Sequence, residues 1–177
     1  MQRKAFCLFL AALPLIAAEG GTPSGFLGEF INQLNDTEKK FVGLAEAVPQ
    51  EKYSWRPGEG VRSVSEVFMH VAGANFMLTR IVGVAPPSGL DPKMEKTVTE
   101  KAEVKEMLTK SFAHMRKAAM ETKDSDLDSK VKVFGRETTK RDAFLLFATH
   151  MHEHLGQSIA YARVNSVVPP WSKKGSD

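Results

Sequence analysis

Two histidines one helical turn apart are the residues of this sequence best suited to chemistry. His150 and His154 stand at positions i and i+4, so in a helix their imidazoles project from one face, about 6 Å apart. At that separation both rings can bind the same metal ion. A third histidine, His70, lies in an earlier apolar segment. From a facing helix it would complete a three-histidine site with an open position for water or a substrate.

Helical geometry separates this pair from its polar neighbours. At about 100° per residue, His150 and His154 lie about 40° apart on one flank of the apolar stripe. His152 falls on the opposite flank, and Glu153 points away from the pair, so the sequence offers no clear general base. We therefore expect His152, like His114, to be a solvated surface residue.

The elements that would position these histidines are helices. Hydrophobic residues recur at helical spacing in four segments, about 26–48, 64–82, 100–122 and 139–164. The second segment follows Ser63-Val64-Ser65-Glu66, which fits a capping box. Residues 124–140 have a loop-like composition, within which 130–135 allow a short extended stretch. Together these features predict an all-α fold, a four-helix bundle, in which metal ligands commonly lie on facing helices.

The first eighteen residues have the features of an export signal. Arg3 and Lys4 form a basic start, residues 5–16 are apolar apart from Pro14, and Ala17-Ala18 supplies the small residues that a signal peptidase needs. The apolar run is shorter than the roughly 20 residues that span a bilayer. We therefore expect cleavage and no stable membrane anchor, with the mature protein exported to the periplasm or secreted.

Removal of residues 1–18 changes the composition in two ways that bear on function. The chain has 24 basic and 21 acidic residues, and the signal takes two basic residues and no acidic one, leaving 22 against 21. This near balance argues against a nucleic-acid partner. Cys7, the only cysteine, leaves with the signal. The mature chain then has no thiol, and a metal site must use His, Asp or Glu.

The remaining 159 or so residues suffice for one domain with a substantial core. We expect a linker over 19–25, a single helical domain over 26–170 and a polar tail over 171–177. The expected partner is a small-molecule substrate of unknown identity. A homodimer stays open as well, because bundles with exposed apolar flanks often dimerise.

The order and spacing of several motifs resemble the DinB family of four-helix metalloproteins. The resemblance covers about 26–170 and rests on Trp55-Arg56-Pro57, the helix start at Ser63, Glu66-Val67-Phe68-Met69-His70 and His150-x-x-x-His154-x-Gly156-Gln157. It implies a divalent metal, nickel or zinc, held by His70, His150 and His154. The family also includes thiol-dependent isomerases and transferases. The export signal departs from those enzymes, whose thiol cofactors are cytoplasmic.

Three functional hypotheses follow. The first is a divalent-metal-dependent enzyme, of hydrolase or transferase type, whose three-histidine site in a bundle cleft polarises a water or a substrate oxygen. The second is a non-catalytic metal- or ligand-binding protein of the cell envelope, because base, nucleophile and phosphate-binding loop are all missing from the sequence pattern. The third is a bundle whose histidines are only structural, since histidines at the edge of an apolar face are commonly hydrogen-bonded core residues.

Four other residues singled out in the sequence also have two interpretations each. Gln157 and Asn75 either orient ligand histidines or form buried hydrogen bonds between helices. Trp55 lines the mouth of a cleft or plugs the packing between helices. Gly156 either permits close approach of a neighbouring helix or a ligand, or has only an ordinary packing role.

Overall fold

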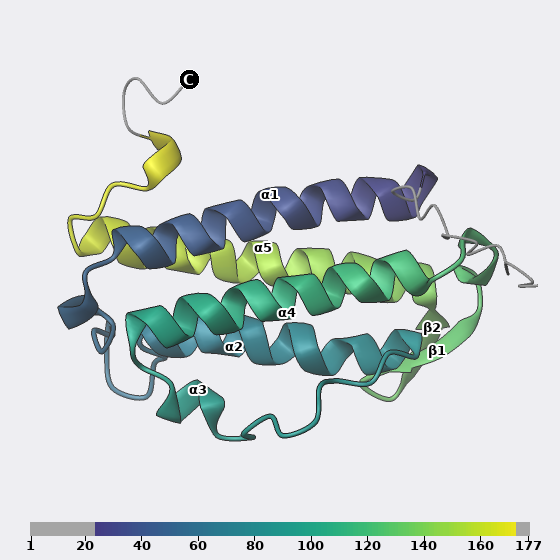
Figure 1. Ribbon diagram of the computed structural model, residues 1–177, viewed down its shortest axis with the longest axis horizontal. Coiled ribbons are helices and arrows are strands. Elements are labelled where there is room, and N and C mark those ends of the chain that lie inside the picture. The colour runs from purple at the N-terminus through teal and green to yellow at the C-terminus, as the bar shows by residue number, and fades with distance from the viewer. Residues whose placement is uncertain (1–23, 173–177) are drawn as a thin grey trace, which may run out of the picture.

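The computed structural model describes residues 24–172 (Figure 1). The predicted export signal over 1–18, Cys7, most of the linker and residues 173–177 of the tail lie outside the described residues. Four long helices run side by side as a bundle: α1 (Gly25–Ala47), α2 (Val64–Leu78), α4 (Lys101–Glu121) and α5 (Lys140–Val164). The predicted four-helix bundle is confirmed.

Shorter elements connect the long helices. The second predicted helix ends as an α-helix at Leu78 and continues as the 3-10 turn η2 (Thr79–Val82). Between α2 and α4 the chain passes along the outside of α2 and forms the four-residue helix α3 (Met94–Thr97). Three further 3-10 turns are η1 (Gln50–Lys52), η3 (Asp124–Asp126) and η4 (Pro170–Ser172). None of the helices within 24–172 is long and apolar enough to cross a membrane.

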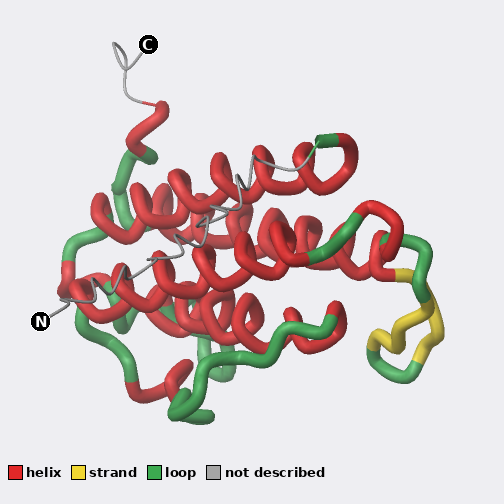
Figure 2. The backbone as a smooth tube through the Cα atoms, turned by 45° about the vertical axis from the view of Figure 1, so that its right-hand side comes forward, coloured by secondary structure: helices red, strands yellow, loops and turns green. Residues whose placement is uncertain are grey.

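A β-hairpin adds to the predicted helical fold. Strands β1 (Lys130–Val133) and β2 (Arg136–Thr139) pair antiparallel, with Val133 opposite Arg136, and project from one end of the bundle (Figure 2). The expected extended stretch over 130–135 was too short, because its partner strand follows at once. Phe134 and Gly135, with φ of 48° and 84°, form the two-residue turn, and positive φ at both positions suits the twist of a hairpin.

Local sequence signals fix where the helices begin. The Ser63 side chain accepts a hydrogen bond from the Glu66 N–H, and the Glu66 carboxylate accepts one from the Ser63 N–H, so the predicted capping box is confirmed. At the start of α5, the Thr139 hydroxyl accepts from the Asp142 N–H. Two of the four long helices therefore have side-chain caps that satisfy N–H groups of the first turn.

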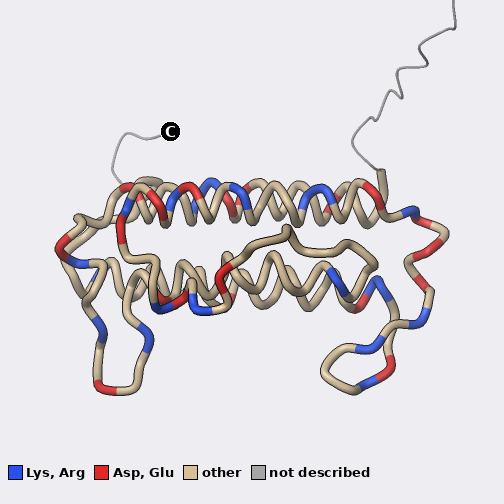
Figure 3. Tube along the Cα trace, turned by 60° about the horizontal axis from the view of Figure 1, so that its bottom comes forward, with Lys and Arg blue, Asp and Glu red and all other residues tan. Residues whose placement is uncertain are grey.

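Buried aromatic rings join the helices. Phe41 of α1 contacts Phe68 of α2 and Phe112 of α4, with ring centroids 6.3 and 5.9 Å apart. Phe30 of α1 packs edge-on against Phe144 of α5 at 4.9 Å. All five rings are buried, which excludes water from the centre of the bundle. Outside it, Lys and Arg are interspersed with Asp and Glu along the chain (Figure 3). The packing sets α5 against α2, where the predicted site lies.

Candidate metal centre

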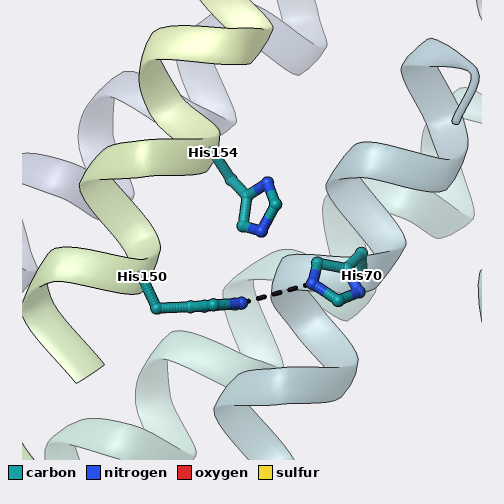
Figure 4. Close-up of side chains that lie close together, drawn as sticks. All are labelled: His70, His150 and His154. Carbon is teal, nitrogen blue, oxygen red and sulfur yellow. Dashed lines mark hydrogen bonds between the residues drawn. The ribbon is translucent and has the colours of Figure 1, made fainter. Parts of the chain in front are cut away.

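Helices α2 and α5 bring His70, His150 and His154 together (Figure 4). Each offers one ring nitrogen, and these atoms all lie within 4.8 Å of one another. The Nε2 atoms of His70 and His150 are 3.2 Å apart, and the His154 ring centre lies 4.6 Å from each of the other two. The three histidines singled out in the sequence therefore converge on one point.

Glu95 of α3 orients His70. The Nδ1 atom of His70 lies 3.1 Å from Glu95 Oε2, and Arg62 Nε donates to Glu95 Oε1 at 2.9 Å. Partial burial raises the pKa of Glu95, but the hydrogen bonds from Arg62 and His70 outweigh it and hold that pKa below its usual value. Since an ionised carboxylate only accepts, His70 donates from Nδ1 and its Nε2 lone pair faces the other two histidines.

Gln157 holds His154 in the same way. The Nδ1 atom of His154 lies 2.9 Å from Gln157 Oε1, and Gln157 Nε2 donates to the Tyr161 hydroxyl at 3.1 Å. Trp55 packs edge-on against Tyr161, with ring centroids 5.3 Å apart, and is half-buried. The amide orientation that serves both contacts leaves His154 donating from Nδ1, so its Nε2 also carries a lone pair. Of the two interpretations of Gln157, the structure supports orientation of a histidine.

His150 is the least supported ring of the three. Its Nδ1 atom is buried and has no hydrogen-bond partner within residues 24–172. Burial first, and then the neighbouring His154 and His70, lower its pKa to about 4. Burial likewise lowers the pKa of His70. Both rings are therefore neutral at neutral pH, the state in which an imidazole can bind a metal ion.

The facing Nε2 atoms test whether a metal ion fits. Because the Nε2 of His70 carries a lone pair, the Nε2 of His150 either donates a hydrogen bond to it across 3.2 Å or shares a cation with it. Nitrogens bound to one tetrahedral ion at about 2.0–2.1 Å would be about 3.3–3.4 Å apart, close to the 3.2 Å between the Nε2 atoms of His70 and His150. The donor set is three imidazoles with no thiolate, which suits nickel, zinc, copper or iron. The residues present fit a divalent transition-metal ion.

Three other sequence predictions concern polar residues near the site. His152 and Glu153 are exposed, as expected. The prediction that His114 is a solvated surface residue is wrong: its Nε2 lies 2.9 Å from Thr79 Oγ1, and its ring packs against Phe76. Helix α4 crosses α2 at this point, and the spacing of hydrophobic residues within one helix does not show where another helix crosses it.

Asn75 bonds to another helix, and no neighbouring helix comes close to Gly156. Asn75 Nδ2 donates to Ser111 Oγ at 3.3 Å, which links α2 to α4, so the interpretation as a helix–helix hydrogen bond holds. A Cβ at Gly156 would meet nothing within 4 Å, so the predicted close approach of a neighbouring helix is wrong, while the approach of a ligand stays a prediction. Glu95, in turn, was missed by the sequence analysis. It lies on a four-residue helix 25 positions from His70, where no periodic pattern marks it.

Comparisons with known proteins identify the family and the fold. A family model described as the DinB superfamily matches residues 33–158. The uncharacterized protein YjoA of Bacillus subtilis is 25% identical over 138 residues, which cover 77% of this chain and 86% of that protein. Two solved structures share the fold. A DinB-like protein from Bacillus cereus has a TM-score of 0.71 at 17% identity, over 80% of this chain and 93% of its own. The YjoA structure has a TM-score of 0.64 at 18% identity, over 79% and 93%.

Proposed function

We propose that this chain, which belongs to the DinB superfamily, is a divalent-metal-dependent enzyme of hydrolase or transferase type. His70, His150 and His154 would hold the ion. The observation that carries the proposal is the convergence of three imidazoles, two of them held by neighbours in the tautomer that presents Nε2. When bound, a divalent ion with three protein ligands polarises a substrate oxygen or lowers the pKa of a water.

The chain's own residues supply orientation around that ion. Glu95, itself held by Arg62, fixes the His70 ring and makes its Nε2 a more basic ligand for a metal ion. Gln157 does the same for His154 and is anchored on Tyr161. Three imidazoles suit nickel, zinc, copper and iron, and among these we propose nickel or zinc, the two ions that the family resemblance implies.

A non-catalytic metal- or ligand-binding protein of the cell envelope is the second candidate. The observation that favours it concerns the carboxylates. Glu95 already accepts hydrogen bonds from Arg62 and His70, and Glu153 points into solvent. Neither is placed to take a proton from a bound water. The location in the envelope is a proposal from residues 1–18, which a mass measurement on the exported protein would test through the loss of those residues.

Elemental analysis tests the proposed metal. The mature protein, purified without chelator and without a histidine tag, is compared with the His150→Ala/His154→Ala double variant. The matched control is His152→Ala, which removes an exposed histidine from the same helix. We expect about one equivalent of nickel or zinc in the wild type and the control, and none in the double variant. Absence of metal from the wild type after reconstitution with divalent ions would overturn the proposal.

Turnover then separates an enzyme from a binding protein. Hydrolase and transferase substrates are screened with metal-loaded wild type and with the double variant in parallel. Activity confined to the loaded wild type supports the enzyme, whereas a stoichiometric metal that gives no turnover across the screen supports the binding protein.

A further inference from the structure

A pocket of about 700 Å³ lies beside the metal centre, on the outer side of α2. One wall runs from Met69 of α2 to Arg80 of η2, and the other is the segment 86–95 that passes along α2 (Figure 1). His70 and Glu95 belong to the wall, but His150 and His154 do not. The pocket therefore adjoins the Glu95 side of His70, separate from the point where the three imidazoles meet. Its volume is typical of a site for one small molecule.

Most of the pocket wall is apolar. Met69, Met77 and Met94 lie in the wall together with Leu90 and three prolines. Methionine side chains are flexible and polarizable, so they adapt to apolar ligands of different shape. Gly73 deepens the pocket at its middle, since a Cβ there would meet nothing within 4 Å. A ligand with an apolar body matches this wall.

The charged residues of the wall indicate the polar end of such a ligand. Asp91 accepts from the Lys93 N–H at 2.8 Å and from Thr97 Oγ1 at 3.0 Å, and Glu95 accepts from Arg62 and His70. Arg80, by contrast, is exposed and makes no ion pair or side-chain hydrogen bond with the residues from 24 to 172. Asp91 keeps its charge, because both of its donors are neutral, but its two oxygens are occupied within its own segment. The charged side chain of this wall whose hydrogen-bonding atoms stay open to a ligand is the Arg80 guanidinium, whose planar fork matches a carboxylate.

We propose that this pocket binds an elongated apolar carboxylate, with its chain over Gly73 and Met77 and its carboxylate at Arg80. Arg80 follows His70 by ten positions along α2 and η2, which is about 15 Å at the α-helical rise. The apolar end of an extended ligand therefore reaches His70, a proposed metal ligand, and Glu95, which orients it. Binding in this pocket does not depend on the metal, so it can be measured on the metal-free protein.

Calorimetric titration of metal-free protein with decanoate and with decyltrimethylammonium tests the proposal. The two probes share an apolar chain and carry opposite charges. We expect the wild type to bind decanoate about tenfold or more tightly than the cation. Gly73→Leu, which fills the middle of the pocket, should weaken both probes about tenfold or more. Arg80→Gln should weaken decanoate about five- to tenfold and remove the preference for the anion.

Gly156→Leu is the matched control. Gly156 also lies inside a long helix with open space around its Cβ position, but on α5 and outside the pocket. Both substitutions replace a helical glycine by leucine, so effects of helix propensity are shared. The control should bind decanoate with wild-type affinity.

Two results would overturn the proposal. Wild-type decanoate affinity in Gly73→Leu would mean that the ligand does not occupy this pocket, and equal affinity of the wild type for both probes would exclude the carboxylate class. Arg80→Gln alters an exposed side chain, so it keeps the test open if Gly73→Leu fails to fold. Metal content, measured on separate samples, distinguishes the proposals: a protein that binds decanoate but no metal refutes only the metal centre.

Discussion

Two histidine sites flank α2, and they differ in what satisfies the rings. Towards α4, His114 makes a 2.9 Å hydrogen bond to Thr79 Oγ1 and packs on Phe76. Towards α5, His70 faces His150 with Nε2 atoms 3.2 Å apart. Burial lowers the pKa of all three rings. Burial therefore does not mark a metal ligand. The α4 side is complete with protein groups alone, whereas on the α5 side three ring nitrogens converge and the buried Nδ1 of His150 has no partner within residues 24–172.

Removing one ring from each side should break this comparison most clearly. We expect His154→Ala to weaken zinc or nickel binding by more than about 100-fold, because a whole ligand is lost. His114→Ala should keep the metal and lower the melting temperature instead. Titration against a metal-sensitive chelator gives the affinities, and calorimetry gives the melting temperatures. Equal metal loss in the two variants would remove the distinction between the sites.

The next effect concerns Glu95, which forms a hydrogen bond with the ligand His70. Glu95→Ala leaves His70 in place but removes the acceptor at its Nδ1, and we expect metal affinity to fall about 10- to 100-fold. Glu153→Ala, an exposed carboxylate next to His154 in sequence, is the control and should change affinity little. The same chelator competition measures both. If the Glu95 variant keeps full affinity, the carboxylate does not tune the site.

The stability of the metal-free protein should depend on pH through His150, on the α5 side. The pKa of His150 is about 4 in the folded chain against an ordinary value of 6.5, so between these values the unfolded chain binds more protons. The free energy of unfolding should then fall as the pH drops from about 6.5 to about 4. Urea titrations at several pH values would measure this dependence. His150→Gln should reduce this dependence, leaving the part due to His70 and His114, and His152→Gln should not change it. An unchanged slope in His150→Gln would show that His150 is not the group responsible.

The smallest effect belongs to the α4 side. Thr79→Val removes a buried hydroxyl that bonds both the Phe76 carbonyl and His114, and we expect a loss of about 1 kcal/mol in unfolding free energy with metal affinity unchanged. Thr109→Val removes an exposed hydroxyl that also bonds a backbone carbonyl of its helix, and it should change stability little. Urea unfolding of both variants checks the difference. A change in metal affinity in Thr79→Val would mean that the two sides of α2 are coupled.

Much of the fold could be predicted because its signals are local. The capping box at Ser63 and Glu66 spans four residues, and the four long helices follow from hydrophobic spacing within each segment. The hairpin was missed as a pair because Phe134-Gly135 is an unusual turn sequence, outside the Asn-Gly and Asp-Gly pairs that usually signal such a turn. The family resemblance placed His70 beside the α5 pair before any packing was known.

What the sequence by itself determined was therefore the helices and the pairing of His150 with His154 on one face, since four residues of helix bring their rings together whatever else the chain does. Only the tertiary structure decided the neighbours from other elements. Glu95 reaches His70 from 25 residues away, and His114 meets Thr79 across a helix crossing. Such contacts depend on loop paths and on how helices pack against one another, and no spacing within a single segment records either.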